Sequence, residues 1–134
     1  MIVLDTHIFV WLNQNDPRLT DNHRQVIVKE RKHGLGISTI SLIEIARLVT
    51  AERIILPLSI EEWFEIALAQ PGIISISITP KIAVEAQTLP GDFHKDPADR
   101  IIVATARVLN IPVVTVDRKI LNYSFVKVIP PHVN

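Results

Sequence analysis

The sequence IVLD at residues 2–5 is a short apolar run that ends in an aspartate, and VVTVD at residues 113–117 repeats the pattern. Such runs are typical of central strands in a parallel sheet, which are buried on both faces. ISTISLIE (37–44) and DPADRIIVATA (96–106) each place an acid near the start of an expected helix. In a parallel α/β sheet, the strand ends and the starts of the next helices share one edge. We therefore expect four acids to converge at that edge: Asp5, Glu44, Asp99 and Asp117.

Four carboxylates at one edge of a sheet require either a cation or raised pKa values. Two carboxylates about 4 Å apart repel each other by roughly 4 kcal/mol at an effective dielectric constant near 20. Oxygen ligands without cysteine suit a hard cation such as Mg²⁺ or Mn²⁺. Such an ion orients a phosphodiester, lowers the pKa of an attacking water and neutralises charge on the leaving oxygen. The sequence therefore predicts a divalent-metal site with Mg²⁺ or Mn²⁺ as the cofactor.

The same acids also have purely structural explanations. Asp96, directly before Pro97, has the character of a helix N-cap, and Asp99 would lie in the first turn, where a carboxylate favours the helix dipole. Glu44 has the spacing to close a capping box with Ser41. Capping and metal binding are compatible, because a carboxylate in the first turn can face the cleft. For Asp96 we favour the cap and keep contact with the metal as the alternative.

The chain alternates between expected strands and expected helices. The expected strands are residues 2–4, 36–39, 73–78, 113–116 and 125–129, the last at a sheet edge. The expected helices are residues 6–13, 21–33 (stopped by Gly34), a helix opening at Ser41, one capped by Ser59 with Glu62, one from Thr79-Pro80 to about Leu89, and residues 97–109. This alternation implies right-handed parallel crossovers. We expect one domain over residues 1–134, a three-layer α/β/α sandwich with a mainly parallel central sheet.

The composition limits the classes of protein that fit. The chain has 134 residues, of which 48% are hydrophobic and 5% aromatic, so the core consists mostly of aliphatic side chains. The absence of cysteine excludes disulfides, thiolate zinc sites and a cysteine nucleophile. The N-terminal stretch is interrupted by Asp5 and His7 and is not typical of a signal peptide. Since no apolar run approaches the length of a membrane span, we expect a cytoplasmic protein without membrane contact.

Fourteen basic and fourteen acidic residues give a formal net charge of zero. Nucleic-acid binders are usually more basic, although a metal that consumes several acids would leave the remaining surface positive. Several basic residues adjoin the acids and either balance their charge or contact phosphates: Lys95, Arg100, Arg118 and Lys119. His7 and His94 also lie beside the acids and either touch substrate or face solvent.

The four motifs together resemble a PIN domain of the VapC-like toxin branch of type II toxin–antitoxin systems. They are LDTH (4–7), STISLIEIA (38–46), FHKDPADRIIVATAR (93–107) and VVTVDRKI (113–120), in this order along nearly the whole chain. The resemblance implies a PIN-like parallel sheet between helical layers and a Mg²⁺- or Mn²⁺-dependent ribonuclease. The acidic quartet of the family falls on Asp5, Glu44, Asp99 and Asp117, with Asp96 a further acid of this branch and Thr6 its hydroxyl. Members are typically homodimers inhibited by a small VapB-like antitoxin whose tail enters the active-site groove.

Three other functions compete with this interpretation. A phosphoacceptor receiver domain also binds Mg²⁺ at strand ends, but it requires two adjacent acids after the first strand. In this chain a single acid, Asp5, stands there and is followed by Thr6. A phosphatase with an Asp-x-Asp nucleophile is disfavoured because His7 stands at the second position. A PIN-like module that only binds RNA or protein is disfavoured by its intact acids.

The high apolar fraction also predicts a protein partner. Residues 54–68, with Trp63 and Phe64, are a candidate exposed apolar face, and such patches usually mark interfaces. The alternative is that both aromatic side chains belong to the core. We expect a symmetric homodimer without assigning its contact residues.

Overall fold

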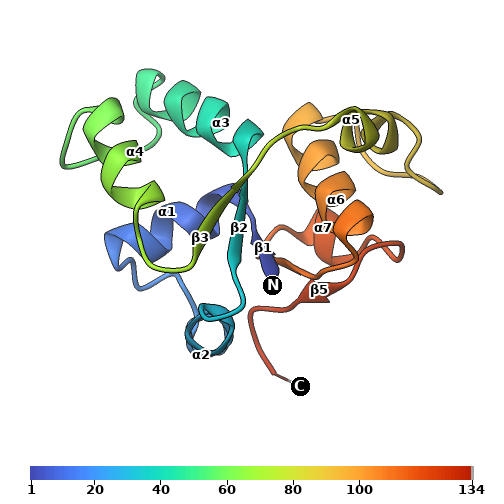
Figure 1. Ribbon diagram of the computed structural model, residues 1–134, viewed down its shortest axis with the longest axis horizontal. Coiled ribbons are helices and arrows are strands. Elements are labelled where there is room, and N and C mark those ends of the chain that lie inside the picture. Colours follow the sequence, from blue (N-terminus) through green and yellow to red (C-terminus); the bar gives the residue numbers. More distant parts are fainter. Residues whose placement is uncertain (134) are drawn as a thin grey trace.

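The computed structural model describes residues 1–133 as one five-stranded parallel sheet flanked by helices (Figure 1). The strands are β1 (Ile2–Leu4), β2 (Leu35–Ser38), β3 (Ile73–Ile76), β4 (Val113–Val114) and β5 (Val128–Ile129). Their order is β3-β2-β1-β4-β5, and all neighbouring pairs run parallel. The apolar run at residues 2–4 therefore forms the central strand, with β5 at one edge as predicted.

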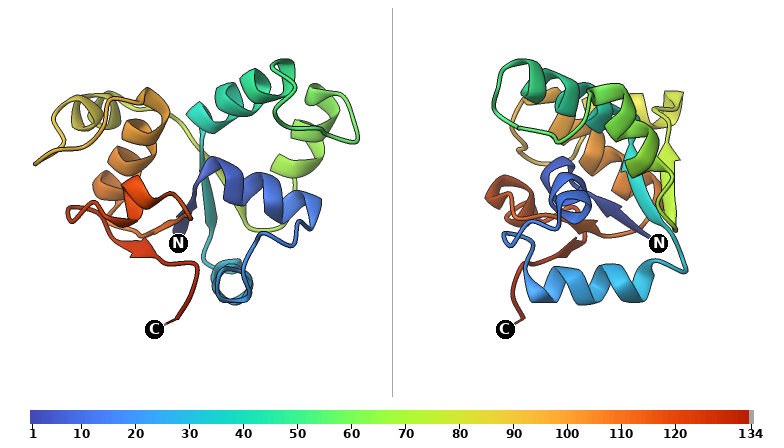
Figure 2. Two further views of the ribbon diagram at one scale, coloured as in Figure 1. Left: turned by 180° about the vertical axis from the view of Figure 1, so that it is seen from behind. Right: turned by 90° about the vertical axis from the view of Figure 1, so that its left-hand side faces the viewer.

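Helices connect the strands on both faces of the sheet. They are α1 (Thr6–Gln14), α2 (Asp21–Glu30), α3 (Thr39–Thr50), α4 (Ile60–Leu68), α5 (Pro80–Gln87), α6 (Pro97–Leu109) and α7 (Arg118–Leu121). In Figure 1, α1, α2 and α4 lie on one side of β1, and α5, α6 and α7 lie on the other; the rear view in Figure 2 agrees. This arrangement confirms the predicted α/β/α sandwich.

Two apolar clusters hold the three layers together. Successive residues of β1 point to opposite faces of the sheet. Leu4 packs into a cluster with Phe9 of α1 and Trp63 of α4. Val3 packs into the other cluster, which includes Ile102 of α6. Because β1 is anchored on both faces, the residue that follows it has a fixed position.

The start of α3 differs from the prediction. The N-cap of α3 is Ser38, whose Oγ accepts a hydrogen bond from the backbone N–H of Ile40 at 3.2 Å. The predicted capping box between Ser41 and Glu44 is therefore wrong, because Ser41 lies inside the helix and is buried. The helix begins directly at the end of β2, and this frees Glu44 from a capping role.

Other element boundaries follow the expected capping chemistry. Ser59 accepts from the N–H of Glu62 and donates its hydroxyl to the Glu62 carboxylate, and Thr79 caps α5 ahead of its first residue, Pro80. The expected helix over residues 21–33 instead ends at Glu30, since its carbonyl receives the N–H of Gly34 in a tight turn. The strands predicted over 73–78, 113–116 and 125–129 are shorter than expected.

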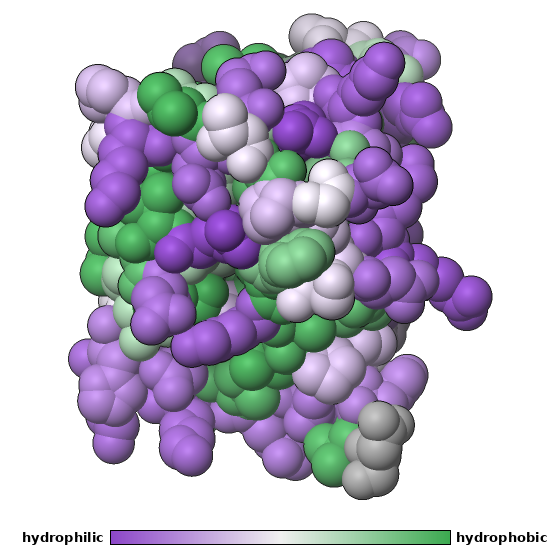
Figure 3. All heavy atoms as spheres, turned by 90° about the vertical axis from the view of Figure 1, so that its right-hand side faces the viewer, coloured by the Kyte–Doolittle hydropathy of each residue, from purple (hydrophilic) through white to green (hydrophobic). Residues whose placement is uncertain are grey.

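The expected exposed aromatic face is wrong for Trp63, which is only 4% exposed and packs edge-on against Phe9. Exposed aliphatic residues occur in the same segment, with Ile55 at 88% and Ile66 at 54%. The side that carries α5 and α6 also shows apolar patches between polar side chains (Figure 3). Within residues 1–133, no helix is both long enough and apolar enough to cross a membrane.

Candidate active site

Acidic side chains from four separate parts of the chain line one cleft with a volume of about 190 Å³. The cleft acids are Asp5, Glu44, Asp96, Asp99 and Asp117. β1 and β4 deliver the first and last of these, because Asp5 caps α1 directly after β1 and Asp117 caps α7 shortly after β4. α3 follows β2 and α6 packs across β1, β2 and β4, so the remaining acids reach the same edge.

Asp5 is the most enclosed of these acids, with 7% of its surface exposed. Its Oδ1 accepts a hydrogen bond from the backbone N–H of Thr6 at 2.8 Å, and its Oδ2 accepts one from the hydroxyl of Thr115 at 2.6 Å. Burial raises the pKa of Asp5, and these two hydrogen bonds only oppose that rise. Both carboxylate oxygens are thus held in place at a position where ionisation is disfavoured without a cation.

Thr115 links two of the acids, a role that was not predicted from the sequence. Its hydroxyl donates to Asp5 and accepts from the backbone N–H of Asp117 at 3.0 Å. The side chain is fully buried. A signal for this role was present, because Thr115 is the polar residue inside the apolar run VVTV.

Asp99 shows the strongest electrostatic effect in the cleft. Its burial, together with the negative charges of the other four cleft acids, raises its pKa to about 8. The His94 Nε2 lies 2.9 Å from the Asp99 Oδ2, although this approach lacks hydrogen-bond geometry. The other four carboxylates thus lie close enough to Asp99 for their charges to disfavour its ionisation.

The donor chemistry of the cleft fits a hard divalent cation. Carboxylate oxygens dominate it, and their mutual repulsion is the condition that a bound cation relieves. Across residues 1–133, however, no three acidic or histidine side chains already stand in a geometry that could hold a metal ion. Asp5 is turned towards Thr115, Asp99 towards His94 and Glu44 towards Arg47. Asp99 and Glu44 would therefore have to rotate away from these contacts to join the fixed Asp5 carboxylate around an ion.

Asp96 lies at the rim of the cleft and caps α6. Its Oδ1 accepts a hydrogen bond from the backbone N–H of Asp99 at 3.1 Å, and Pro97 follows as the first helical residue. The cap predicted from the sequence is confirmed. The side chain also lines the acidic cleft, so Asp96 stays a candidate metal ligand in addition to its role as a cap.

The basic residues near the acids separate into two groups. Arg100 donates from Nε to the carbonyl of Ala86 and from Nη1 to the carbonyls of Phe93 and His94. These contacts fasten the loop before α6 and favour a structural role. The other three basic residues are exposed and available to a polyanion: Lys95, Arg118 and Lys119.

Thr6 and His7 stand on α1 beside Asp5 but differ in exposure. The Thr6 side chain is buried, and its Oγ1 lies 2.8 Å from the Oγ of Ser41. This contact joins α1 to α3, so Thr6 positions the two acid-bearing helices and does not face the cleft. His7 is exposed and borders the cleft, where it remains a candidate for substrate contact.

Comparison with known proteins adds to this geometry. The PIN domain family model matches residues 2–126. Ribonuclease VapC22 of Mycobacterium tuberculosis is 35% identical over 122 residues, which cover 91% of each protein. A chain of VapBC2 from Rickettsia felis, solved bound to promoter DNA, aligns with a TM-score of 0.71 at 20% identity, covering 97% of this chain and 98% of that one. DNA-bound VapBC from Salmonella typhimurium gives 0.71 at 17% identity, with 98% of each chain covered. At these identities the two structures show a common fold.

Proposed function

Because the chain belongs to the PIN domain family, we propose that it is an endoribonuclease that hydrolyses RNA phosphodiester bonds with Mg²⁺ or Mn²⁺. The observation that carries this proposal is the convergence of acids from four segments on one cleft. The similarity to a ribonuclease along 91% of the chain supports the choice of RNA. A receiver domain does not fit the family, and a non-catalytic RNA-binding module would bind RNA without cleaving it.

The chain's own residues would prepare the cleft for this reaction. A divalent ion supplies charge neutralisation and an activated water when it is bound. Asp5 is held rigid by Thr6 and Thr115, which suits a ligand whose oxygens must keep their direction. Asp99, with its pKa near 8, has to release its proton before it can ligate a cation. Glu44 and Asp117 line the same cleft and would help to hold the ion.

Cleavage of a defined RNA tests the proposal. We expect cleavage with Mg²⁺ or Mn²⁺ and none with EDTA. Asp5→Asn should abolish cleavage. The amide oxygen can still accept from the Thr6 N–H and the amide NH2 can donate to the Thr115 hydroxyl oxygen, so the variant should still fold. Asp21→Asn, at an exposed position of α2 outside the cleft, is the matched control. Full activity of a pure Asp5→Asn protein would reject the assignment of the site.

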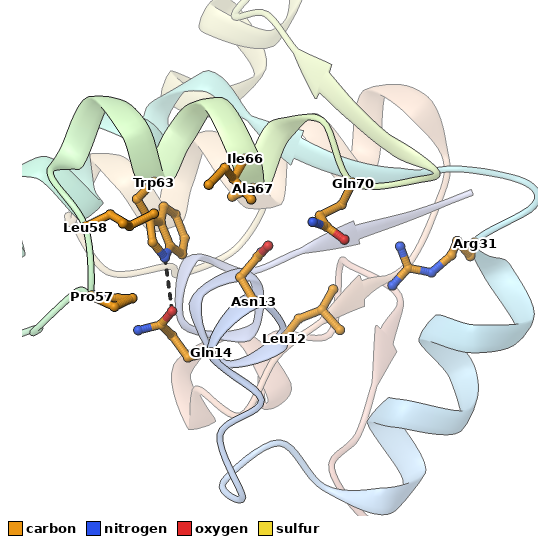
Figure 4. Close-up of a pocket in the computed structure, with 10 residues that line it drawn as sticks. All are labelled: Leu12, Asn13, Gln14, Arg31, Pro57, Leu58, Trp63, Ile66, Ala67 and Gln70. Atoms are coloured by element: carbon orange, nitrogen blue, oxygen red, sulfur yellow. Dashed lines mark hydrogen bonds between the residues drawn. The ribbon is translucent and has the colours of Figure 1, made fainter.

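We further propose that the protein is the toxin of a toxin–antitoxin pair. A toxin–antitoxin complex from Klebsiella pneumoniae contains a chain of similar fold, which supports this partner class. A cavity of about 230 Å³ between α1, α4 and the end of α2 provides a place for it (Figure 4). Leu58 and Ile66 are exposed there, beside Trp63, whose Nε1 donates to the side chain of Gln14. Arg31 adds a cation at the far end of this groove.

Co-purification tests the groove. The probe is the product of a small open reading frame next to this gene, expressed together with the toxin. Ile66→Glu should weaken the complex, because a charge would be buried against an apolar helix face. Ile55→Glu is the control, since Ile55 is more exposed and lies outside the groove. Equal retention of the partner by both variants would place the contact elsewhere.

A further inference from the structure

A second hollow opens directly beside the acidic cleft. Its volume is about 340 Å³, within the range of small-ligand sites. One wall is α3, with Ile40, Ile43 and Arg47, and the other is the start of α6, with Pro97. Glu44 and Asp96 line both this hollow and the acidic cleft. The two spaces are therefore neighbours, with these two side chains at their common border.

The α3 wall combines apolar and cationic surface on one side of the helix. Residues 40, 43, 44 and 47 lie three or four positions apart, so their side chains share a face. The Ile43 side chain is 65% exposed, so it contributes little to the apolar core. The Arg47 side chain is 63% exposed, and its Nη2 lies 4.0 Å from Glu44 Oε2. An exposed isoleucine, an acid at the cleft and an arginine thus follow one another along α3.

We propose that this hollow binds an unpaired RNA base next to the scissile phosphate, an inference that rests on the proposed ribonuclease function. A phosphate held at the acids brings its attached nucleosides to the shared Glu44–Asp96 border. The apolar side chains offer a surface for the face of a base, and the planar Arg47 guanidinium can stack on it or donate to its edge. The two shared carboxylates can accept hydrogen bonds from amino groups.

A base site in this hollow would distinguish unpaired RNA from paired RNA. A base can enter the hollow only when it is turned out of a helical stack, as in single strands and loops. Paired bases in a duplex remain stacked and cannot reach the α3 wall. We therefore expect cleavage in unpaired segments, with a preference for the base at one position beside the cut.

Cleavage of RNAs randomised around the cut site measures that preference. In Ile43→Ala the preference should flatten, and kcat/KM for single-stranded RNA should fall about tenfold, the usual effect of losing apolar contact in a binding pocket. Arg47→Gln should change the same preference. Ile55→Ala, another exposed isoleucine outside both spaces, is the control and should match the wild type.

A binding measurement keeps the test independent of turnover. In Asp5→Asn protein with Mg²⁺, a 2-aminopurine placed beside the cut site should change its fluorescence when it enters the hollow. Adding Ile43→Ala should remove that change, whereas adding Ile55→Ala should retain it. If the wild type cleaves RNA but Ile43→Ala and Arg47→Gln leave both the preference and the fluorescence unaltered, the base site is refuted and the ribonuclease stands. If the wild type cleaves no RNA, the ribonuclease function fails, and with it this inference.

Discussion

The cleft acids should make the metal-free protein less stable as the pH rises, and Asp99→Asn should remove much of this effect. The pKa of Asp99 is raised from 3.8 to about 8 in the folded protein. A carboxyl with a raised folded-state pKa contributes stability that is complete below about pH 4. That contribution is lost as the pH rises through about 8. Asparagine cannot ionise, so the variant escapes this loss.

The size of the effect follows from the shift. About four pKa units at 1.36 kcal/mol each set an upper bound of roughly 6 kcal/mol. The Asp99 side chain keeps 15% of its surface exposed, and water can enter the cleft when the side chains relax. We therefore expect Asp99→Asn to raise the free energy of unfolding by about 2 to 3 kcal/mol at high pH, within the order of magnitude for one partly buried charge. The difference should almost vanish below about pH 4 and grow as the pH rises from about 4 to about 8.

Urea unfolding in EDTA, at several pH values from about 4 to about 9, measures this difference. Mg²⁺ provides the second arm of the experiment. It should stabilise the wild type by mass action, and should stabilise Asp99→Asn much less because a ligand is missing. The control is Asp21→Asn, which removes an exposed carboxyl group outside the cleft. If the difference between Asp99→Asn and the wild type is the same at every pH, the assigned repulsion is absent.

Three further results are expected. Asp96→Ser should keep the cap of α6 and most activity, whereas Asp96→Ala should lose about 1 kcal/mol of stability; complete loss of activity in folded Asp96→Ser would instead make Asp96 a ligand. Thr115→Val should lower activity more than stability, because it frees the Asp5 carboxylate to rotate; unchanged metal affinity and activity would deny this positioning role. Light scattering at tens of micromolar protein should give a dimer mass, and a strictly monomeric mass would reject the homodimer.

Sequence patterns predicted the fold because several local signals agreed. An apolar run that ends in an acid is typical of a central strand in a parallel sheet, and this pattern located β1 and β4. The helix over Pro97–Leu109 has the predicted bounds and begins directly after its predicted cap, Asp96. The four acids could be grouped for the same reason, since topology alone brings strand ends to one edge. The capping box at Ser41 failed because β2 runs directly into α3, so a different serine at the strand end was already in position to cap.

By itself, the sequence determined the parallel α/β architecture, the set of acids and their common edge, because these depend on periodicity and on order along the chain. Only the tertiary structure decided how each side chain is used. It turned Arg100 towards backbone carbonyls, buried the hydroxyl of Thr6, and joined Thr115 to Asp5 across 110 positions of the sequence. Burial and charge proximity likewise set the pKa of Asp99, because both depend on neighbours that arrive from other elements. A local pattern carries no information about such neighbours until the chain has folded around them.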